Sequence, residues 1–368
     1  AVDSGDVSAS GWLEGRVREE TGHGQLEYAI HGLTVTRKGD RGRASARGTL
    51  KLRSGSVLDG AVDLTGSDLT LEDLRGVVAG VHVRAATLVG TARRAVIRRG
   101  DAPDVNVDVD LPNTEVTDLR DLSTLLHAGV RVTGGRAVVS GKASVRVRAR
   151  DLTARGSAHA EGLSLEVGEV TARAGVDARV AAVRWNWGDH QARIEHPEVI
   201  VRDLTVAETL GEAGIATAPV LSARSRRIGL GPGGTSGIVA VDLPRMEIDN
   251  LSLLTRRMTL SGAVVVERGE ASASVHGDLD LFSLAASGDA SVTVPALRVK
   301  VGRDLYAGNL TARLRARVVP GQAGTMLLSG SDVAFASAGA PSSDAWWAWA
   351  WLGDATVNVT GAGHFRGD

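Results

Sequence analysis

The feature that most constrains this chain is a regular alternation of apolar and polar side chains along most of its length. In the segment 105–111, VNVDVDL, every second residue is Val or Leu and the residues between them are Asn or Asp. Successive side chains of a β-strand point to opposite faces, so this pattern predicts a strand with one apolar face and one polar face. The same pattern recurs in residues 145–150, 163–167, 170–180, 199–206, 271–281, 292–301 and 310–318.

The spacing of the turns predicts how these strands connect. Gly, Asn, Asp and Pro interrupt the alternation about every 8 to 12 residues, which is typical of a long antiparallel meander and predicts about 25 strands. At about 4.8 Å per strand, one flat sheet would extend roughly 120 Å, more than a twisted sheet sustains without curling. We therefore expect an all-β protein, a long antiparallel meander curled into an elongated hydrophobic groove (a β-taco), with one or two short helices.

Three segments interrupt the strand pattern and predict helices. Residues 118–127 place four Leu on one helical face, with Thr117 or Asp118 as N-cap. Residues 206–212 are a weaker helix candidate, because Gly interrupts them. Residues 345–352 follow the capping sequence PSSD; as a strand they would place alternate Trp residues on one face, but the capping residues favour a helix.

No sharp change in composition divides the chain into domains. We expect a single elongated repeating β-groove region over residues 1–368, with a candidate sub-boundary at the Gly-rich turn 229–234, GLGPGG. A degenerate tripeptide, Asp/Gly/Asn-Leu-Ser/Thr, recurs at irregular intervals, which argues against a short-period solenoid and suits hairpins of variable length. Its central residues are Leu33, Leu64, Leu69, Leu122, Leu152, Leu163, Leu204, Leu251 and Leu310.

Composition excludes several classes of function. The absence of Cys excludes disulfide scaffolds, Cys-ligated metal sites and thiol nucleophiles. A net charge of -1, with basic residues spread along the chain, argues against a nucleic-acid partner. The sequence has no apolar stretch of the roughly 20 residues that span a bilayer, and its first residues lack a signal pattern, so we expect a mature chain or an excised piece without a membrane anchor.

Catalytic motifs are lacking in the sequence. There is no Gly-x-Ser-x-Gly elbow, Walker loop or His-Glu-x-x-His motif. Asp104, Asn106 and Asp108 approximate the spacing of a calcium loop, but Val109 stands where that loop requires Gly. A strand with an acidic outer face explains the same residues, and residues 229–233 are better explained as a turn than as a dinucleotide loop.

One cluster of titratable residues could in principle bind a metal or move protons. His190 and His196 lie close in sequence to Asp189 and Glu195. Pro197 argues against an unbroken strand that would place both His on one face, so a solvated loop is the preferred interpretation. We therefore expect a protein that is not an enzyme and has no cofactor and no metal.

The scarcity of aromatic side chains indicates what the apolar faces could bind. The chain has 7 Trp but only 3 Phe and 2 Tyr, so the apolar faces consist of Val, Leu and Ala. A large sandwich core normally includes aromatic rings to fill its volume. A trough of short aliphatic side chains instead suits acyl chains, whose burial is favourable by about 0.8 kcal/mol per CH₂.

Several segments resemble the strands of AsmA-like and TamB-like envelope proteins. These segments are residues 31–35 (HGLTV), 67–71 (SDLTL), 161–165 (EGLSL), 202–206 (RDLTV), 111–119 (LPNTEVTDL) and 130–137 (VRVTGGRA). The resemblance is diffuse, covers most of the chain and includes no diagnostic motif. Members of this family usually have an N-terminal membrane anchor, and we expect this chain to depart from that pattern unless an anchor was removed from it.

The resemblance implies a repeating β-groove protein that carries phospholipids between the inner and outer membranes of a Gram-negative bacterium. It also implies a location in the periplasm or cell envelope. The implied partners are phospholipid and, in addition, a membrane surface or envelope membrane proteins, without nucleic acid.

Two sets of candidate residues follow. The expected lipid-binding floor consists of Val105, Val107, Val109, Val145, Val147, Val170, Val176, Leu251, Leu253, Val292, Val294, Leu310 and Leu314. The expected cap or membrane contact consists of Trp346, Trp347, Trp349 and Trp351. The alternative is a structural or adhesive cell-surface β protein with closed sandwich-like cores, because alternating Val and Leu commonly line a closed core.

Overall fold

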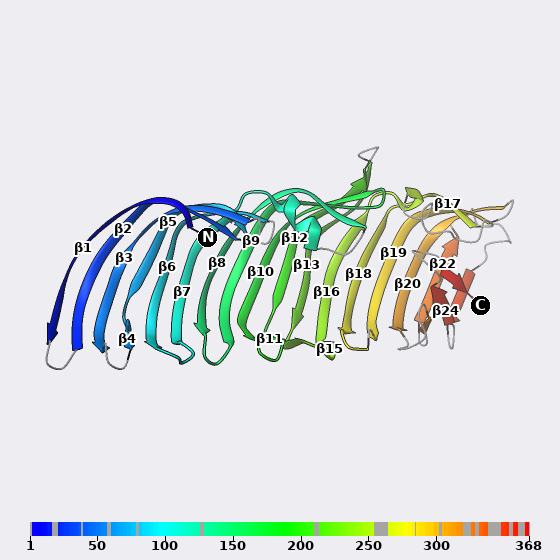
Figure 1. Cartoon of the computed structure of the whole chain (residues 1–368). Coiled ribbons are helices and arrows are strands. Elements are labelled where there is room, and N and C mark those ends of the chain that lie inside the picture. The colour runs from blue at the N-terminus through cyan, green and yellow to red at the C-terminus, as the bar shows by residue number, and fades with distance from the viewer. Residues whose placement is uncertain are drawn as a thin grey trace. The chain divides into compact units, whose positions relative to one another are not determined.

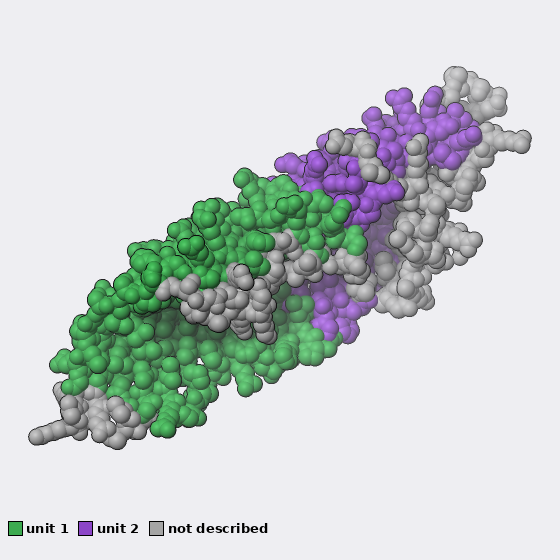
Figure 2. Space-filling model, turned by 45° about the horizontal axis from the view of Figure 1, so that its top comes forward, with its two compact units in different colours: residues 1–163, 177–197, 229–233 green, residues 164–176, 198–228, 234–368 purple. Residues whose placement is uncertain are grey.

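The protein is all-β, as the alternation predicts, and its strands are antiparallel to their neighbours. The computed structural model describes residues 2–16, 21–37, 40–56, 60–78, 81–125, 129–209, 213–253, 264–283, 285–301, 304–318, 325–327, 331–337, 347–352, 356–359 and 365–367. The chain forms two compact units (Figure 2). Unit 1 comprises residues 1–163, 177–197 and 229–233, and unit 2 comprises residues 164–176, 198–228 and 234–368.

Unit 1 is a meander in which each long strand pairs with the next along the chain (Figure 1). Strand β4 continues the line of β5, because it pairs with β3 on one side and β6 on the other. The strands are β1 (Val2–Arg16), β2 (Thr21–Arg37), β3 (Asp40–Ser56), β4 (Ala61–Asp63), β5 (Asp68–Val78), β6 (Val81–Arg98), β7 (Asp104–Val116), β8 (Val130–Arg146) and β11 (Gln191–Glu195).

Unit 2 repeats this arrangement, with neighbours in the order β12, β13, β16, β18, β19, β20, β22 and β23. Three further strands contribute residues to both units: β9 (Asp151–Val167), β10 (Val170–Asn186) and β14 (Arg227–Gly231). The strands of unit 2 are β12 (Glu198–Glu208), β13 (Gly214–Ser225), β15 (Gly234–Ser236), β16 (Ile238–Ile248), β17 (Val264–Arg268), β18 (Ala271–Asp280), β19 (Ala286–Val301), β20 (Asp304–Val318), β21 (Thr325–Leu327), β22 (Ser331–Ser337), β23 (Trp347–Leu352), β24 (Thr356–Val359) and β25 (Phe365–Gly367).

The strands of unit 1 curve over at one end (Figure 1), and β-bulges mark the bends. Gly32 in β2, Asp73 in β5 and Asn113 in β7 have left-handed backbone with φ of 65°, 51° and 48°. The pairing register shifts beside each of them, as expected when two residues of one strand oppose one residue of its neighbour. Because a bulge bends its strand and increases the local twist, these residues fix where unit 1 curves.

Unit 2 has similar features. Ala296 in β19 has φ of 60° and lies at a register shift between Val294 and Leu297. The register of β16 shifts between Leu243 and Met246, and Asp203 in β12 has left-handed backbone with φ of 52°. The residue that follows the left-handed position is often Leu, which explains part of the degenerate tripeptide. Leu33, Leu163 and Leu204 follow the left-handed residues Gly32, Gly162 and Asp203, whereas Leu122 and Leu251 lie in helical segments.

Many of the buried side chains in the two units are Ala. Ala85 in β6 is 0% exposed and pairs with Leu74, the residue that follows the bulge at Asp73. Side chains on the inner face of a bent sheet converge, so a methyl group fits where a longer chain would clash. The buried Ala residues among the described positions are Ala44, Ala46, Ala85, Ala95, Ala137, Ala216, Ala218, Ala271, Ala273 and Ala312.

Unit 2 also has a core of larger aliphatic side chains. Its buried cluster consists of Ile215, Ala216, Ile248, Ala271, Val294 and Leu297. Val266 from β17 and Val299 from β19 pack against this cluster from the part of the sheet beyond the bulge at Ala296. The apolar side chains on both sides of the bend therefore share one core, which places the apolar face inside the curve.

Of the three predicted helices, one is present and two are wrong over their described residues. The predicted helix at residues 118–127 is present as η1 (Leu119–Leu125), a 3₁₀-helix, and residues 126–128 lie outside the described part. The predicted helix at 206–212 is wrong over its described residues, because β12 continues to Glu208; residues 210–212 lie outside the described part. The predicted helix at 345–352 is also wrong, because residues 347–352 form β23 and pair with β22.

The predicted strand at 145–150 ends earlier than expected. Strand β8 stops at Arg146, and residues 147–150 form the turn into β9, with Arg150 at φ 55°. An ion pair between Arg146 and Asp151 closes this turn. Val147 therefore belongs to a turn and not to a strand.

A substitution at the most buried Ala tests the packing at the bend. Ala85→Leu should lower the free energy of unfolding by about 1–3 kcal/mol, because the added methylenes have no space beside Leu74 and Thr114. Ala86→Leu, at the exposed neighbouring position, should change it by less than about 0.5 kcal/mol. Urea unfolding followed by circular dichroism measures both, and equal effects would contradict a tightly packed bend.

A second substitution tests the left-handed bulge. Ala296→Gly should raise the free energy of unfolding by about 0.5–1 kcal/mol, because left-handed backbone costs Ala about 1–2 kcal/mol and Gly loses part of that gain through chain entropy. Ala290→Gly, at an extended position of the same strand, should lower it by at least about 0.5 kcal/mol. A loss of stability in Ala296→Gly would show that the bulge is not strained.

Candidate functional site

In unit 1, the register of the strands brings four of the expected floor residues onto one face. Val107 in β7 lies directly opposite Val145 in β8, and Val105 and Val109 occupy the same face of β7. A row of apolar residues crosses this face at the level of Val109, and large side chains in it alternate with small ones. The row consists of Tyr28, Gly48, Leu69, Gly90, Val109 and Ala143.

In unit 2, Val294 lies opposite Leu310, and Leu314 lies opposite Ala290, so Val292, Val294, Leu310 and Leu314 share one face. The same face continues over β16 and β18, where it is lined in part by Val241, Val275 and Leu279. A depression of about 260 Å³ lies there.

At two opposing Gly residues, this apolar surface has no side chains. Gly277 in β18 lies opposite Gly288 in β19. A Cβ atom on Gly288 would lie 2.5 Å from the carbonyl oxygen of His276, and a Cβ atom on Gly277 would lie 2.7 Å from that of Ser287. The two strands approach too closely here for any side chain, which leaves a shallow floor between Val275 and Leu279.

The apolar faces are only partly covered. Val199 and Val275 in unit 2 are 37% and 40% exposed, and Leu26 and Leu50 in unit 1 are exposed to a similar degree. Of the expected floor residues, Val294 alone is buried, with 3% of its surface exposed. Figure 2 shows unit 1 hollowed between two walls of side chains. An aliphatic face that stays accessible in this way can accept an apolar ligand.

Several expected floor residues occupy other positions. Val147 lies in the turn after β8 and is 40% exposed. Leu251 and Leu253 lie in a helical turn over residues 251–253, where the side-chain oxygen of Asn250 accepts hydrogen bonds from the backbone N–H groups of Ser252 and Leu253. Both Leu residues pack against the buried cluster of unit 2, so they support the core and do not line a strand face.

The remaining expected residues are placed as follows. Val170 in β10 also packs against the buried cluster of unit 2, and Val176 lies partly buried in the same strand. Trp346 and the side chains of Trp347, Trp349 and Trp351 lie outside the described residues, so a cap or membrane contact there stays a prediction. Val199, Val241, Val275 and Leu279 also lie on the apolar face but were not among the expected floor residues, although the alternation around each of them could have identified them.

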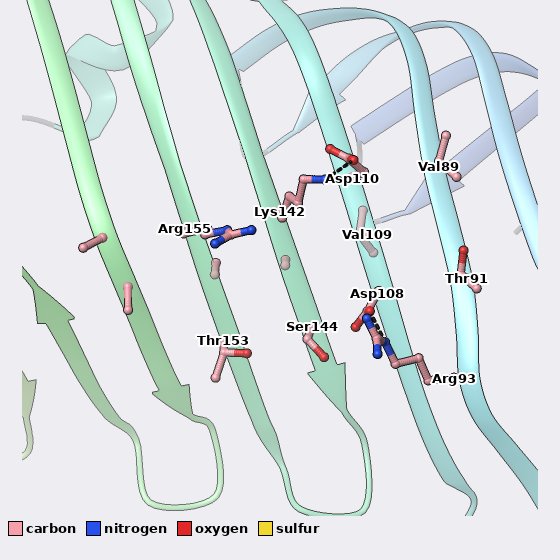
Figure 3. Close-up of a pocket in the computed structure, with 14 residues that line it drawn as sticks. Val89, Thr91, Arg93, Asp108, Val109, Asp110, Lys142, Ser144, Thr153 and Arg155 are labelled. Atoms are coloured by element: carbon pink, nitrogen blue, oxygen red, sulfur yellow. Dashed lines mark hydrogen bonds and ion pairs between the residues drawn. The ribbon is translucent and has the colours of Figure 1, made fainter.

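The opposite face of the sheet in unit 1 is charged, and many of its ions are paired across strands. Asp108 pairs with Arg93, and Asp110 pairs with Lys142 at 2.8 Å (Figure 3). Burial raises the pKa of Asp108, but the hydrogen bonds from Arg93 and Ser144 prevail and hold this pKa below its ordinary value. These residues line a depression of about 880 Å³ on the polar face.

These pairs settle the interpretation of the acidic strand. Asp104 pairs with Arg94 at 2.6 Å, so each of the three Asp in β7 has a basic partner, and the strand interpretation of residues 104–111 is confirmed. His190 lies in a turn and His196 at a bend, on either side of β11. Within the described ranges, no group of three or more His, Asp and Glu is arranged to hold a metal ion.

The described part of the chain contains no helix that is long and apolar enough to cross a membrane.

One His on the polar face of unit 1 provides a test of these electrostatics. The Nδ1 atom of His159 lies 2.7 Å from Asp177 and its Nε2 atom 3.5 Å from Glu161, and these hydrogen bonds raise its pKa above the ordinary value. A raised pKa means that the contribution of His159 to stability is complete below about pH 6.5, the unfolded value, and is lost as the pH rises through the folded pKa.

NMR titration of His159 measures this directly. Asp177→Asn should lower the pKa of His159 more than Glu161→Gln does, because the hydrogen bond to Asp177 is the stronger influence. Similar pKa values in the wild type and both variants would contradict the pairing.

No family model, curated protein or solved structure matches this chain.

Proposed function

We propose that this protein is a non-enzymatic carrier that binds phospholipid acyl chains along its apolar faces and conducts them. The observation that supports this function best is that apolar rows, continuous across neighbouring strands, stay partly exposed, as at Val199 and Val275. A closed core would bury such rows. The proposal includes transport between the inner and outer membranes of a Gram-negative envelope, as the resemblance to AsmA-like and TamB-like proteins implies.

The chemistry of the apolar faces favours an aliphatic ligand. Apart from Tyr28, the residues named on these faces are Val, Leu, Ala and Gly, which present no ring for stacking and whose hydrogen-bonding groups are already used in the strand pairing. An acyl chain on such a face would gain about 0.8 kcal/mol for each CH₂ removed from water. The ion-paired opposite face is suited to contact with water.

The proposed partners follow from the same arrangement. Phospholipid is the ligand, and a membrane surface or an envelope membrane protein would deliver and receive it in the periplasm. A net charge of -1 disfavours nucleic acid. The alternative, a structural or adhesive cell-surface protein with closed cores, is disfavoured by the partial exposure of Val275 and Val199.

The first experiment is extraction of the purified protein and mass spectrometry of the extract, followed by transfer of fluorescent phospholipid between vesicles. Val275→Asp places a carboxylate on the apolar face of β18 and should slow transfer at least about tenfold, because burying a charge beside an acyl chain is costly. Ser274→Asp adds the same charge on the opposite face of the same strand and should leave transfer unchanged.

Circular dichroism must show that both variants are folded. A lipid-free wild-type protein, equal transfer by the two variants, or unfolding of Val275→Asp alone would each overturn the proposal in favour of a closed core.

A further inference from the structure

Three Arg residues form a row across neighbouring strands of unit 1. Arg43 in β3 lies directly opposite Arg75 in β5, and Arg75 lies directly opposite Arg84 in β6. Adjacent strands are about 4.8 Å apart, so the backbones of the three Arg lie within about 10 Å of one another. Arg75 follows the bulge at Asp73 by two residues.

This row differs from the ion-paired parts of the polar face. Like charges directly opposite each other destabilise a sheet. Several basic residues of unit 1 face an acid, as Arg47 faces Glu72 at 2.7 Å and Arg136 faces Glu161. Arg184 and Arg193 also lie opposite each other, but as a pair and not as a row of three. Arg43, Arg75 and Arg84 make no ion pair with any residue that the structure describes. Glu115 lies directly opposite Arg84. It is the one carboxylate that the strand register adds to this row of three Arg residues.

The surroundings of the row are suited to an anion. A depression of about 450 Å³ is lined by the three Arg, by the hydroxyl-bearing residues Thr34 and Thr117, and by His82. The rest of its described lining is Gly and Val, without Asp or Glu. A ligand there meets several hydrogen-bond donors, and Glu115, opposite Arg84, is not part of the described lining.

The row also lies apart from the apolar face. Arg43 and Arg84 are exposed and directly precede the buried Ala44 and Ala85, and successive residues of a strand point to opposite faces. The three Arg therefore lie on the face opposite the buried Ala residues. A ligand could occupy this depression whether or not the apolar face holds an acyl chain.

We propose that Arg43, Arg75 and Arg84 bind a phosphate group, carried either by a lipid headgroup or by a small soluble molecule. The guanidinium fork matches a pair of phosphate oxygens and binds them bidentately, and charge-assisted hydrogen bonds of this kind are the strong ones. A phosphate placed among the three Arg also cancels the repulsion between them. This site does not depend on the proposed lipid transport.

Two kinds of probe identify the source of the phosphate. Calorimetry with inorganic phosphate and with pyrophosphate detects a soluble ligand. Flotation with vesicles of phosphatidylcholine containing phosphatidic acid, compared with vesicles of phosphatidylcholine alone, detects a lipid headgroup. Binding in either arm supports the site and names the source, whereas no binding in any arm at low ionic strength overturns it.

Matched variants locate the binding. Arg75→Gln removes the central charge and should weaken binding at least about tenfold, as expected for losing hydrogen bonds to a charged group. Arg47→Gln removes one positive charge from the same sheet outside the row and should leave binding within about twofold. Arg75→Lys keeps the charge but loses the bidentate fork, so it should bind with intermediate strength. Equal weakening by Arg75→Gln and Arg47→Gln would show an effect of net charge and would overturn the proposal.

Thermal unfolding separates binding from a structural role. Arg75→Gln relieves repulsion within the row, so its melting temperature without ligand should be higher than that of the wild type. A lower melting temperature together with lost binding would show that Arg75 supports the fold instead. Val275→Asp should retain phosphate binding, which keeps this test independent of lipid transport.

Discussion

Cross-strand register is the constraint on which the rest of this structure depends. Side chains alternate between the two faces with a period of two, so a slip of one residue in any strand would move its Val and Leu to the polar face and its Asp and Arg to the apolar one. The pairing of Val107 with Val145 and the ion pair between Asp110 and Lys142 belong to the same two strands, β7 and β8. Apolar contacts on one face and ion pairs on the other therefore specify the same register.

Curvature depends on a different set of residues. Left-handed bulges at Gly32 and Asp73 bend the strands of unit 1, and small side chains such as Ala85 fill the inside of the bend. Large apolar side chains are thereby left on the straighter parts of the strands, where Leu26 and Leu50 stay partly exposed. Packing at the bends stabilises the sheet without covering the apolar side chains on the straighter parts. Those side chains therefore stay accessible to the proposed apolar ligand.

Local sequence predicts much of this fold, and the errors have a common physical cause. The alternation in residues 105–111 correctly predicts β7, since period two is a property of each strand alone. The helix predicted at 345–352 is wrong because its capping residues act locally, whereas pairing with β22 is a long-range interaction that favours the Trp-rich segment as a strand. The row of Arg43, Arg75 and Arg84 was missed for the same reason: register brings together residues that the sequence separates.

The placement of the bulges sets the unit by which such a sheet can change in length over evolution. Those at the bends occur in β2, β5 and β7 and again in β16 and β19, and β12 has a left-handed residue at Asp203, while the strands between them carry the small side chains that fill the bends. One bent strand and one small-residue strand make a complete repeat, which is a single hairpin. Duplication or deletion of one hairpin would preserve the alternation of strand types and both faces of the sheet, whereas gain or loss of a single strand would place two bulged strands or two small-residue strands side by side.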